Sequence, residues 1–241
     1  MTRSHRPRSI LAAALASLPL ALLVACESDT APVAAAIRNE DAPRVREILA
    51  EDVARHRAGV AKAAERLAPG FAVEDPAERE RQLRAALRAM RQPPRGVDEL
   101  VASPMSFLAA VAADGRVIAR GAEPDTMKGT DFRERYPVVA RALDAGEAGV
   151  GLGEFPAEGG GESSFSVLFV APVERDGAVG GAVGAGIPLW RVARRRSTQL
   201  RLERSGGDAD DVLWVFTTRR DRLFAPQAGL EIGGVLPDGE T

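Results

Sequence analysis

Cysteine, histidine and aromatic residues are all scarce in this 241-residue sequence. It contains one cysteine and two histidines, and aromatic residues make up 5% of the chain. A single cysteine excludes an intrachain disulfide framework and a multi-cysteine metal cluster. The two histidines, His5 and His56, leave almost no material for a histidine-rich metal site or a Ser-His-Asp triad. We therefore expect no metal, no cofactor and no catalysis.

Neither sign of charge dominates. The sequence has 32 basic and 34 acidic residues, for a net charge of -2. Nucleic-acid-binding chains usually carry a strong basic excess, so we expect no nucleic-acid partner. Apolar residues make up 45% and charged residues 27%, which is the balance of an ordinary globular chain. The length corresponds to one or two domains.

The first 26 residues have the pattern of an export signal. Arg3, Arg6 and Arg8 form a basic start, and the uncharged run ILAAALASLPLALLVA follows at residues 10–25. This run has 16 residues and contains Pro19, whereas crossing a bilayer takes roughly 20 apolar residues. A cleaved signal is therefore favoured over a permanent transmembrane helix.

The apolar run ends in Leu23-Val24-Ala25-Cys26, which resembles the lipobox of bacterial lipoproteins. There the cysteine is acylated, with palmitate among the acyl groups, and becomes the new N-terminus. The alternatives are a signal that contains a cysteine by chance and an uncleaved anchor. Acyl chains contribute about 0.8 kcal/mol per buried methylene, so two or three chains hold a domain firmly on a bilayer. The resemblance implies a membrane anchor at Cys26 on the periplasmic side of a bacterial membrane, in the cell envelope, and Glu27 slightly favours the outer membrane.

Removal of the signal leaves an acidic mature chain. Basic residues fall from 32 to 29, because the signal holds three arginines, while all 34 acidic residues remain. The net charge becomes about -5, which disfavours nucleic acid as a partner still further. Polar and small residues then form a tether over residues 27–41.

Residues 42–104 are predicted to be helical. Apolar residues recur every three to four positions over 42–67, and Pro69 is expected to end this helix. A second helix is predicted over 76–90, with Asp75 as its N-cap.

Residues 105–204 mix strand pairs with helices. The run FLAAVA, an Asp-Gly turn and RVIAR predict a hairpin, and a second pair of strands is predicted over 163–172 and 178–188. Helices are predicted over 131–145 and 189–203. Strand pairs joined by short turns indicate an antiparallel sheet, so the fold class is α+β, with about five to six strands and long N-terminal helices packed against them.

The order of these segments resembles a Cache domain, the extracytoplasmic relative of the PAS fold. The residues that match the opening pattern of that family are Asp114, Gly115, Met127, Gly129 and Asp131. RYPVVARALDAGEAG at 135–149 matches its helix, and LFVAPVERDGAVGGAVGAGIPL at 168–189 matches its closing hairpin. The resemblance covers about residues 42–189 and implies a PAS-like sheet.

The Cache resemblance implies a pocket for a small molecule between one face of the sheet and the connecting helix and loops. The candidate contacts are Arg120, Arg133, Arg135, Tyr136, Ser164 and Ser166. A guanidinium group binds a carboxylate through two hydrogen bonds, so a carboxylate ligand is favoured. A solvated surface position is the alternative for the arginines, and packing in the core is the alternative for the tyrosine. The amino-acid-binding signature of the family does not match, so an amino-acid ligand is not supported by the sequence.

Three further patterns have structural interpretations. The glycine-rich stretch 180–186 lacks the lysine and hydroxyl residue of a phosphate loop, and close backbone packing explains it better. Arg194, Arg195 and Arg196 are expected on a solvated helix face, with lipid headgroups or an acidic partner as the alternative contact. His56 lies on the apolar side of the first helix, where a packed or hydrogen-bonded side chain is expected.

Residues 205–241 allow two interpretations. They form a hairpin that completes the first sheet, or they are the remnant of a second Cache-like unit, since residues 212–234 weakly resemble 107–129. We favour the hairpin.

Taken together, the sequence predicts a lipid-anchored extracytoplasmic module that binds a small molecule and acts as a sensory accessory. The sequence shows no downstream transmembrane helix or signalling domain, so the expected partner is a separate transmembrane receptor or envelope protein. The alternative is a structural or protein-interaction envelope lipoprotein that keeps the fold without a ligand pocket. An enzyme is a weaker third alternative, because no nucleophile–base pair is evident in the sequence.

Overall fold

The computed structural model describes residue 35 and residues 37–101, 103, 105–155, 164–204, 217–219, 222–224 and 231–233. The predicted export signal with Cys26, most of the predicted tether and most of residues 205–241 lie outside the described residues. The chain divides into two compact units, residues 1–48 and 49–241, and the boundary falls inside the first long helix. None of the helices described is both long enough and apolar enough to cross a membrane.

The described elements follow one another as helices, a strand pair, two short helices, three strands, a long helix and three short strands. In chain order they are η1 (Ile37–Asp41, a π-helical turn), α3 (Ala42–Phe71), α4 (Pro76–Ala89), α5 (Asp98–Val101), β1 (Phe107–Ala112), β2 (Val117–Arg120), α6 (Phe132–Arg135), α7 (Pro137–Ala145), β3 (Gly149–Phe155), β4 (Ser164–Arg175), β5 (Ala178–Pro188), α8 (Leu189–Arg204), β6 (Thr217–Arg219), β7 (Arg222–Phe224) and β8 (Glu231–Gly233).

The first long helix runs past the residue expected to end it. Proline removes a backbone donor and disfavours the helix interior, yet α3 continues from Pro69 to Phe71. Its last turn tightens, because Ala72 N donates to Pro69 O at 3.2 Å and Val73 N donates to Gly70 O at 3.3 Å. The ring of Phe71 also lies against the backbone of Gly181 in β5. Tertiary packing therefore holds this end of the helix where local sequence predicts a stop.

The second helix follows its sequence signal closely. The Asp75 side chain accepts a hydrogen bond from Glu78 N at 2.7 Å, which satisfies one of the free donors of the first turn of α4. Leu83 and Leu87 are fully buried and anchor the helix in the core. The predicted cap is confirmed.

The five longest strands form one antiparallel sheet in the order β2-β1-β5-β4-β3. The turn after β1 places Gly115 at a φ of 92°, and the turn between β4 and β5 places Asp176 and Gly177 at 51° and 78°. Such left-handed conformations suit tight hairpins. The α+β prediction, with a PAS-like antiparallel sheet and N-terminal helices, is confirmed.

The helix predicted over 131–145 is broken into α6 and α7. Tyr136 lies between them in an extended conformation, with φ of -129° and ψ of 105°. The cause is Pro137, since proline disfavours helical geometry in the residue before it. The break turns Tyr136 into the core, where it is buried.

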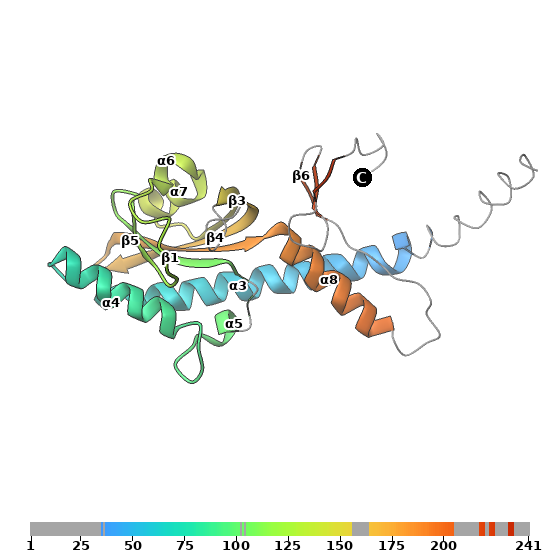
Figure 1. Cartoon of the computed structure of the whole chain (residues 1–241), viewed down its shortest axis with the longest axis horizontal. Coiled ribbons are helices and arrows are strands. Elements are labelled where there is room, and N and C mark those ends of the chain that lie inside the picture. The colour runs from blue at the N-terminus through green and yellow to red at the C-terminus, as the bar shows by residue number, and fades with distance from the viewer. Residues whose placement is uncertain are drawn as a thin grey trace, which may run out of the picture. The chain divides into compact units, whose positions relative to one another are not determined.

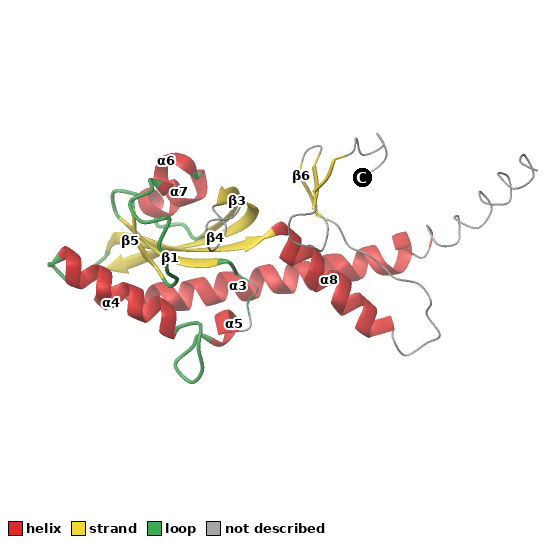
Figure 2. Ribbon diagram, in the orientation of Figure 1, coloured by secondary structure: helices red, strands yellow, loops and turns green. Residues whose placement is uncertain are grey.

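Each face of the sheet has its own core. On one face, α3, α4 and α5 contribute Leu67, Leu87 and Leu100 to a cluster with alternate strand residues, such as Phe169 of β4. On the other face, α6 and α7 pack over the remaining strand residues, including Phe107 and Leu168. Figure 1 shows α3 and α4 on one side of the sheet and α6 and α7 on the other, and Figure 2 shows the strands between these helical layers.

The C-terminal strands do not join this sheet. Strands β6, β7 and β8 pair with one another in a separate three-stranded antiparallel sheet. The favoured expectation, a hairpin that completes the first sheet, is therefore wrong. The sequence pattern indicates strands in this segment but does not show which sheet they join.

Candidate functional site

Four aromatic rings gather on the face of the sheet that α6 and α7 cover. Phe155 lies at the centre, with ring centroids 4.7 Å from Phe107, 4.7 Å from Tyr136 and 5.8 Å from Phe132. Phe132 and Tyr136 meet edge to face at 5.0 Å. Tilted and edge-to-face pairs of this kind add roughly 0.5–1.5 kcal/mol each beyond burial. This aromatic cluster occupies the face where the Cache resemblance implies a pocket.

Glycines in the strands make room for these rings. A Cβ atom at Gly153 would overlap the rings of Tyr136 and Phe155, and a Cβ atom at Gly186 would overlap the ring of Phe107. The glycine-rich character of β5 therefore serves close packing, as its sequence predicts, rather than phosphate binding.

Two polar residues predicted as ligand contacts are buried on the same face. Arg120 is the register partner of Ala109, a member of the aromatic-side core, and is only 1% exposed. Ser166 is fully buried and pairs with Gly153 in the neighbouring strand. The Nε and one terminal nitrogen of Arg120 and the Oγ of Ser166 have no hydrogen-bond partner among the described residues. Buried polar groups usually have partners, so these atoms have unused binding capacity.

The positive charge of Arg120 is nonetheless balanced by the carboxylate of Asp125. Its Nε lies 3.5 Å from Asp125 Oδ1, and its other terminal nitrogen donates to the carbonyl of Pro124. Asp125 also accepts a hydrogen bond from the backbone N–H of Arg120 and pairs with Arg84 of α4 at 3.3 Å. The guanidinium is therefore held in a fixed position.

The other predicted contacts are spread over the domain. Arg133 and Arg135 are exposed, and Arg133 forms a surface ion pair with Asp144 at 2.8 Å. Tyr136 donates from its hydroxyl to Glu154 O at 2.8 Å, and burial raises the pKa of this hydroxyl. Ser164 is half-buried at the start of β4. The structure thus places Tyr136 and Ser166 beside Gly153, with Arg120 buried on the same face of the sheet, while Arg133 and Arg135 are exposed.

A second polar cluster, which sequence reasoning missed, lies on the opposite face between α3 and α8. Asp52 of α3 is 6% exposed, and one of its oxygens pairs with the buried guanidinium of Arg196 of α8. Its other oxygen lies 3.6 Å from Arg195 and 3.7 Å from Arg55. Arg196 is therefore not on the solvated face that its position in an arginine run suggested. Its partner is 144 residues away in the chain, so no local pattern connects the two.

His56 lies beside this cluster, stacked on Phe169 at a centroid distance of 5.2 Å. Its Nδ1 lies 2.6 Å from the carbonyl of Asp52, and its Nε2 lies 2.7 Å from Ser103 Oγ. In the neutral ring, Nδ1–H donates to the carbonyl and the serine hydroxyl donates to Nε2. The serine and histidine are within reach of each other, but Nδ1 faces the preceding helical turn instead of a carboxylate. The expectation of a packed, hydrogen-bonded His56 is confirmed.

Burial lowers the pKa of His56, and the charges of Arg195 and Arg55 act in the same direction, whereas Asp52 opposes them. The unfolded chain then binds more protons than the folded chain near the ordinary histidine pKa of 6.5. We predict that the free energy of unfolding decreases as pH falls through this value. His56 is the only histidine after the predicted signal.

Urea unfolding of the wild type and His56→Gln at pH values between about 7.5 and 5.5 measures this effect. The free energy of unfolding of the wild type should decrease as pH falls over this interval, whereas that of His56→Gln should stay nearly constant. If the free energy of unfolding changes equally with pH in the two proteins, His56 does not contribute to the pH dependence.

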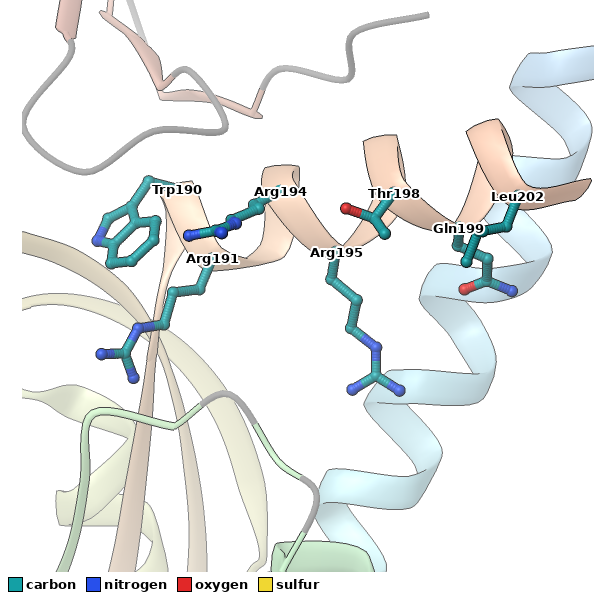
Figure 3. A pocket seen from close by; sticks show the side chains of 7 residues that line it. All are labelled: Trp190, Arg191, Arg194, Arg195, Thr198, Gln199 and Leu202. Carbon is teal, nitrogen blue, oxygen red and sulfur yellow. The ribbon is translucent and has the colours of Figure 1, made fainter. Parts of the chain in front are cut away.

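A hollow of about 540 Å³ lies along the outer side of α8. Its lining is Trp190, Arg191, Arg194, Arg195, Thr198, Gln199 and Leu202 (Figure 3). Arg191 lies over the Trp190 ring at 5.2 Å and donates to Met105 O at 2.9 Å. One helix alone cannot enclose a ligand, so we assign no site here. Among the described residues, no three His, Cys, Asp or Glu side chains gather closely enough to hold a metal ion.

Long helices on one face of a five-stranded antiparallel sheet, with a helical segment over the other face, make a PAS-like α+β arrangement. The chain is similar in fold to the sensory domain of the Campylobacter jejuni chemoreceptor Tlp3 (CcmL) with isoleucine bound, at 9% sequence identity and a TM-score of 0.50, over 70% of this chain and 65% of that one. The ligand-binding domain of the same receptor in complex with 4-methylisoleucine gives a TM-score of 0.51 at 9% identity, over 71% and 66%.

At this level of identity the similarity shows the fold alone. The chain spans about two thirds of the length of the Tlp3 domains. No protein-family model matches the chain, and no curated protein matches it in sequence. The fold-level part of the Cache resemblance, a PAS-like antiparallel sheet with N-terminal helices, is confirmed.

Proposed function

We propose that the chain is an extracytoplasmic small-molecule-binding module that is anchored through lipid at Cys26 and serves a separate transmembrane receptor or envelope protein as a sensory accessory. The fold supports a sensory role, and the N-terminal sequence supports export and anchoring. The proposed location is the periplasmic side of a bacterial membrane, with the outer membrane favoured by Glu27.

The observation that carries the proposal is that Arg120 is buried with part of its hydrogen-bonding capacity unused. A guanidinium that is 1% exposed lies on the side of the sheet implied for a pocket, and two of its nitrogens have no described hydrogen-bond partner. An unsatisfied buried donor costs roughly 1–3 kcal/mol, and more for a charged group. A ligand carboxylate would recover this energy through charge-assisted hydrogen bonds. The unused hydroxyl of Ser166 offers a further contact on the same face.

A specific observation favours the second candidate, an interaction module without a pocket. The four rings of the aromatic cluster fill the space above Gly153 and Gly186. A ligand therefore reaches the buried polar groups only when at least one ring moves. Tyr136 is the side chain best placed to do so, because it lies at the break between α6 and α7.

A thermal-shift screen of residues 27–241 against small metabolites, including a wide range of carboxylates, tests the proposal. This polypeptide retains every residue that the structure describes. A ligand stabilises the folded state by RT ln(1 + [L]/Kd), so a compound at about 100 times its Kd adds roughly 2.7 kcal/mol. We expect at least one compound to raise the Tm of the wild type.

The same compound should raise the Tm of Arg120→Gln much less. The matched control is Arg175→Gln, which removes an exposed guanidinium at the β4–β5 turn and should respond like the wild type. If no metabolite raises the Tm of the wild type, the interaction module is the better account.

A further inference from the structure

A second hollow, of about 320 Å³, lies on the side of the sheet that α3 covers. Four charged side chains line it: Arg55 of α3, Asp98 and Glu99 of α5, and Arg195 of α8. Two carry positive charge and two carry negative charge. This hollow is separate from the aromatic cluster, because its residues come from elements packed on the opposite face of the sheet.

Arg55 and Arg195 form the positive wall of this hollow, and their guanidinium groups have unused hydrogen-bonding capacity. Arg55 and Arg195 share one oxygen of Asp52 at 3.7 and 3.6 Å, while the other oxygen is taken by Arg196. Neither Arg55 nor Arg195 makes a closer hydrogen bond to a described residue. Three guanidinium groups thus surround one carboxylate, which leaves an excess of positive charge. Figure 3 shows Arg195 extending from α8 toward α3, away from Trp190.

Asp98 and Glu99 form the negative wall, and their carboxylates also have unused hydrogen-bonding capacity. Oε1 of Glu99 pairs with Lys62, but its Oε2 is buried and has no hydrogen-bond partner among the described residues. Asp98, the first residue of α5, is exposed and forms no ion pair within the described part of the chain. An additional cation would therefore find carboxylate oxygens available.

The two walls do not neutralise each other. Although all four side chains line the same hollow, no nitrogen of Arg55 or Arg195 lies within 4.0 Å of an oxygen of Asp98 or Glu99. Opposite charges that face one space without touching leave room for a molecule that carries both charges. A volume of 320 Å³ accommodates a molecule of a few to about ten heavy atoms.

We propose that this hollow binds a small zwitterion, with its carboxylate between Arg55 and Arg195 and its ammonium group against Asp98 and Glu99. An α-amino acid is the simplest molecule of this class. The site is additional to the sheet face of the proposed function and does not depend on it. Arginine suits the carboxylate end because its planar donors match two oxygens at once.

The test is isothermal titration of residues 27–241 with each of the common L-amino acids. Acetate and methylamine, which carry only one of the two charges, serve as comparison probes at the same ionic strength. At least one amino acid should bind at least about tenfold more tightly than either comparison probe, because only a zwitterion engages both walls. Arg55→Gln and Glu99→Gln, which change opposite walls, should each weaken that binding by about tenfold or more.

Arg175→Gln is the matched control and should bind like the wild type, and circular dichroism confirms that each variant is folded. Binding that survives Arg55→Gln and Glu99→Gln but is lost in Arg120→Gln would overturn this site and support the proposed sheet-face site instead. Equal affinity for amino acids and acetate, or no binding of any amino acid, would also overturn the inference. A carboxylate whose binding is weakened by Arg120→Gln alone would still support the proposed function.

Discussion

Asp52→Ala is expected to lower the free energy of unfolding by about 3–5 kcal/mol, the usual cost of removing one partner of a buried ion pair. The substitution leaves the guanidinium of Arg196, whose residue is 3% exposed, without its carboxylate. It also leaves Arg55 and Arg195 facing each other and Arg196 without an intervening negative charge. Urea denaturation followed by circular dichroism measures the change.

Two variants separate the buried pair from charge in general. Asp144→Ala removes an exposed partner of Arg133 and should cost no more than about 1 kcal/mol. Asp52→Leu combined with Arg196→Leu replaces both charges with apolar groups and should recover much of the stability lost in Asp52→Ala. A loss below about 1 kcal/mol in Asp52→Ala would show that water already compensates Arg196.

Phe107→Ala should destabilise the domain by about 3–5 kcal/mol, as expected for the loss of a buried aromatic ring. The ring is 1% exposed and contacts Phe155 and Phe132 on the face covered by α6 and α7. Its removal leaves a cavity that the stiff strands around it cannot close. Chemical denaturation of the variant measures the cost, and Leu152→Ala, which changes a side chain that is 52% exposed, should stay within about 0.5 kcal/mol.

A double-mutant cycle with Gly186 identifies the packing as the cause. Gly186→Ala places a methyl group where the Phe107 ring lies, so it should be destabilising in the wild type by about 1–3 kcal/mol. In the Phe107→Ala background the methyl group has room and should cost much less. Additive effects of the two substitutions would mean that the ring does not lie over Gly186.

Local signals predicted most of the fold correctly. The Asp75 cap, the Asp114-Gly115 turn and the apolar run of β1 each depend on residues close together in the chain, and each appears in the structure. The helix predicted over 131–145 was wrong in being unbroken, although Pro137 disfavours a helix through the residue before it. The continuation of α3 past Pro69 was not readable from the sequence, because the contact of Phe71 with β5 decides it.

The candidate sites were less predictable than the fold. Arg120 and Ser166 were identified from their place on strands, yet the sequence does not show that aromatic rings cover the same face. The hollow between α3, α5 and α8 was missed, because its charges come from segments that only the tertiary structure brings together. A buried charge in an arginine-rich helix looks the same in sequence as a solvated one. That ambiguity hid the role of Arg196.

The proposed function requires this PAS-like domain to bind a small molecule. Saturation-transfer NMR on mixtures of small metabolites with residues 27–241 tests it most directly, because the method detects weak ligands without requiring a change in stability. We expect transfer of saturation to at least one carboxylate or zwitterion, and loss of that signal when Arg120 or Arg55 is replaced by glutamine. The absence of transfer to every metabolite from a folded protein would contradict the claim and leave a domain that acts through protein contacts alone.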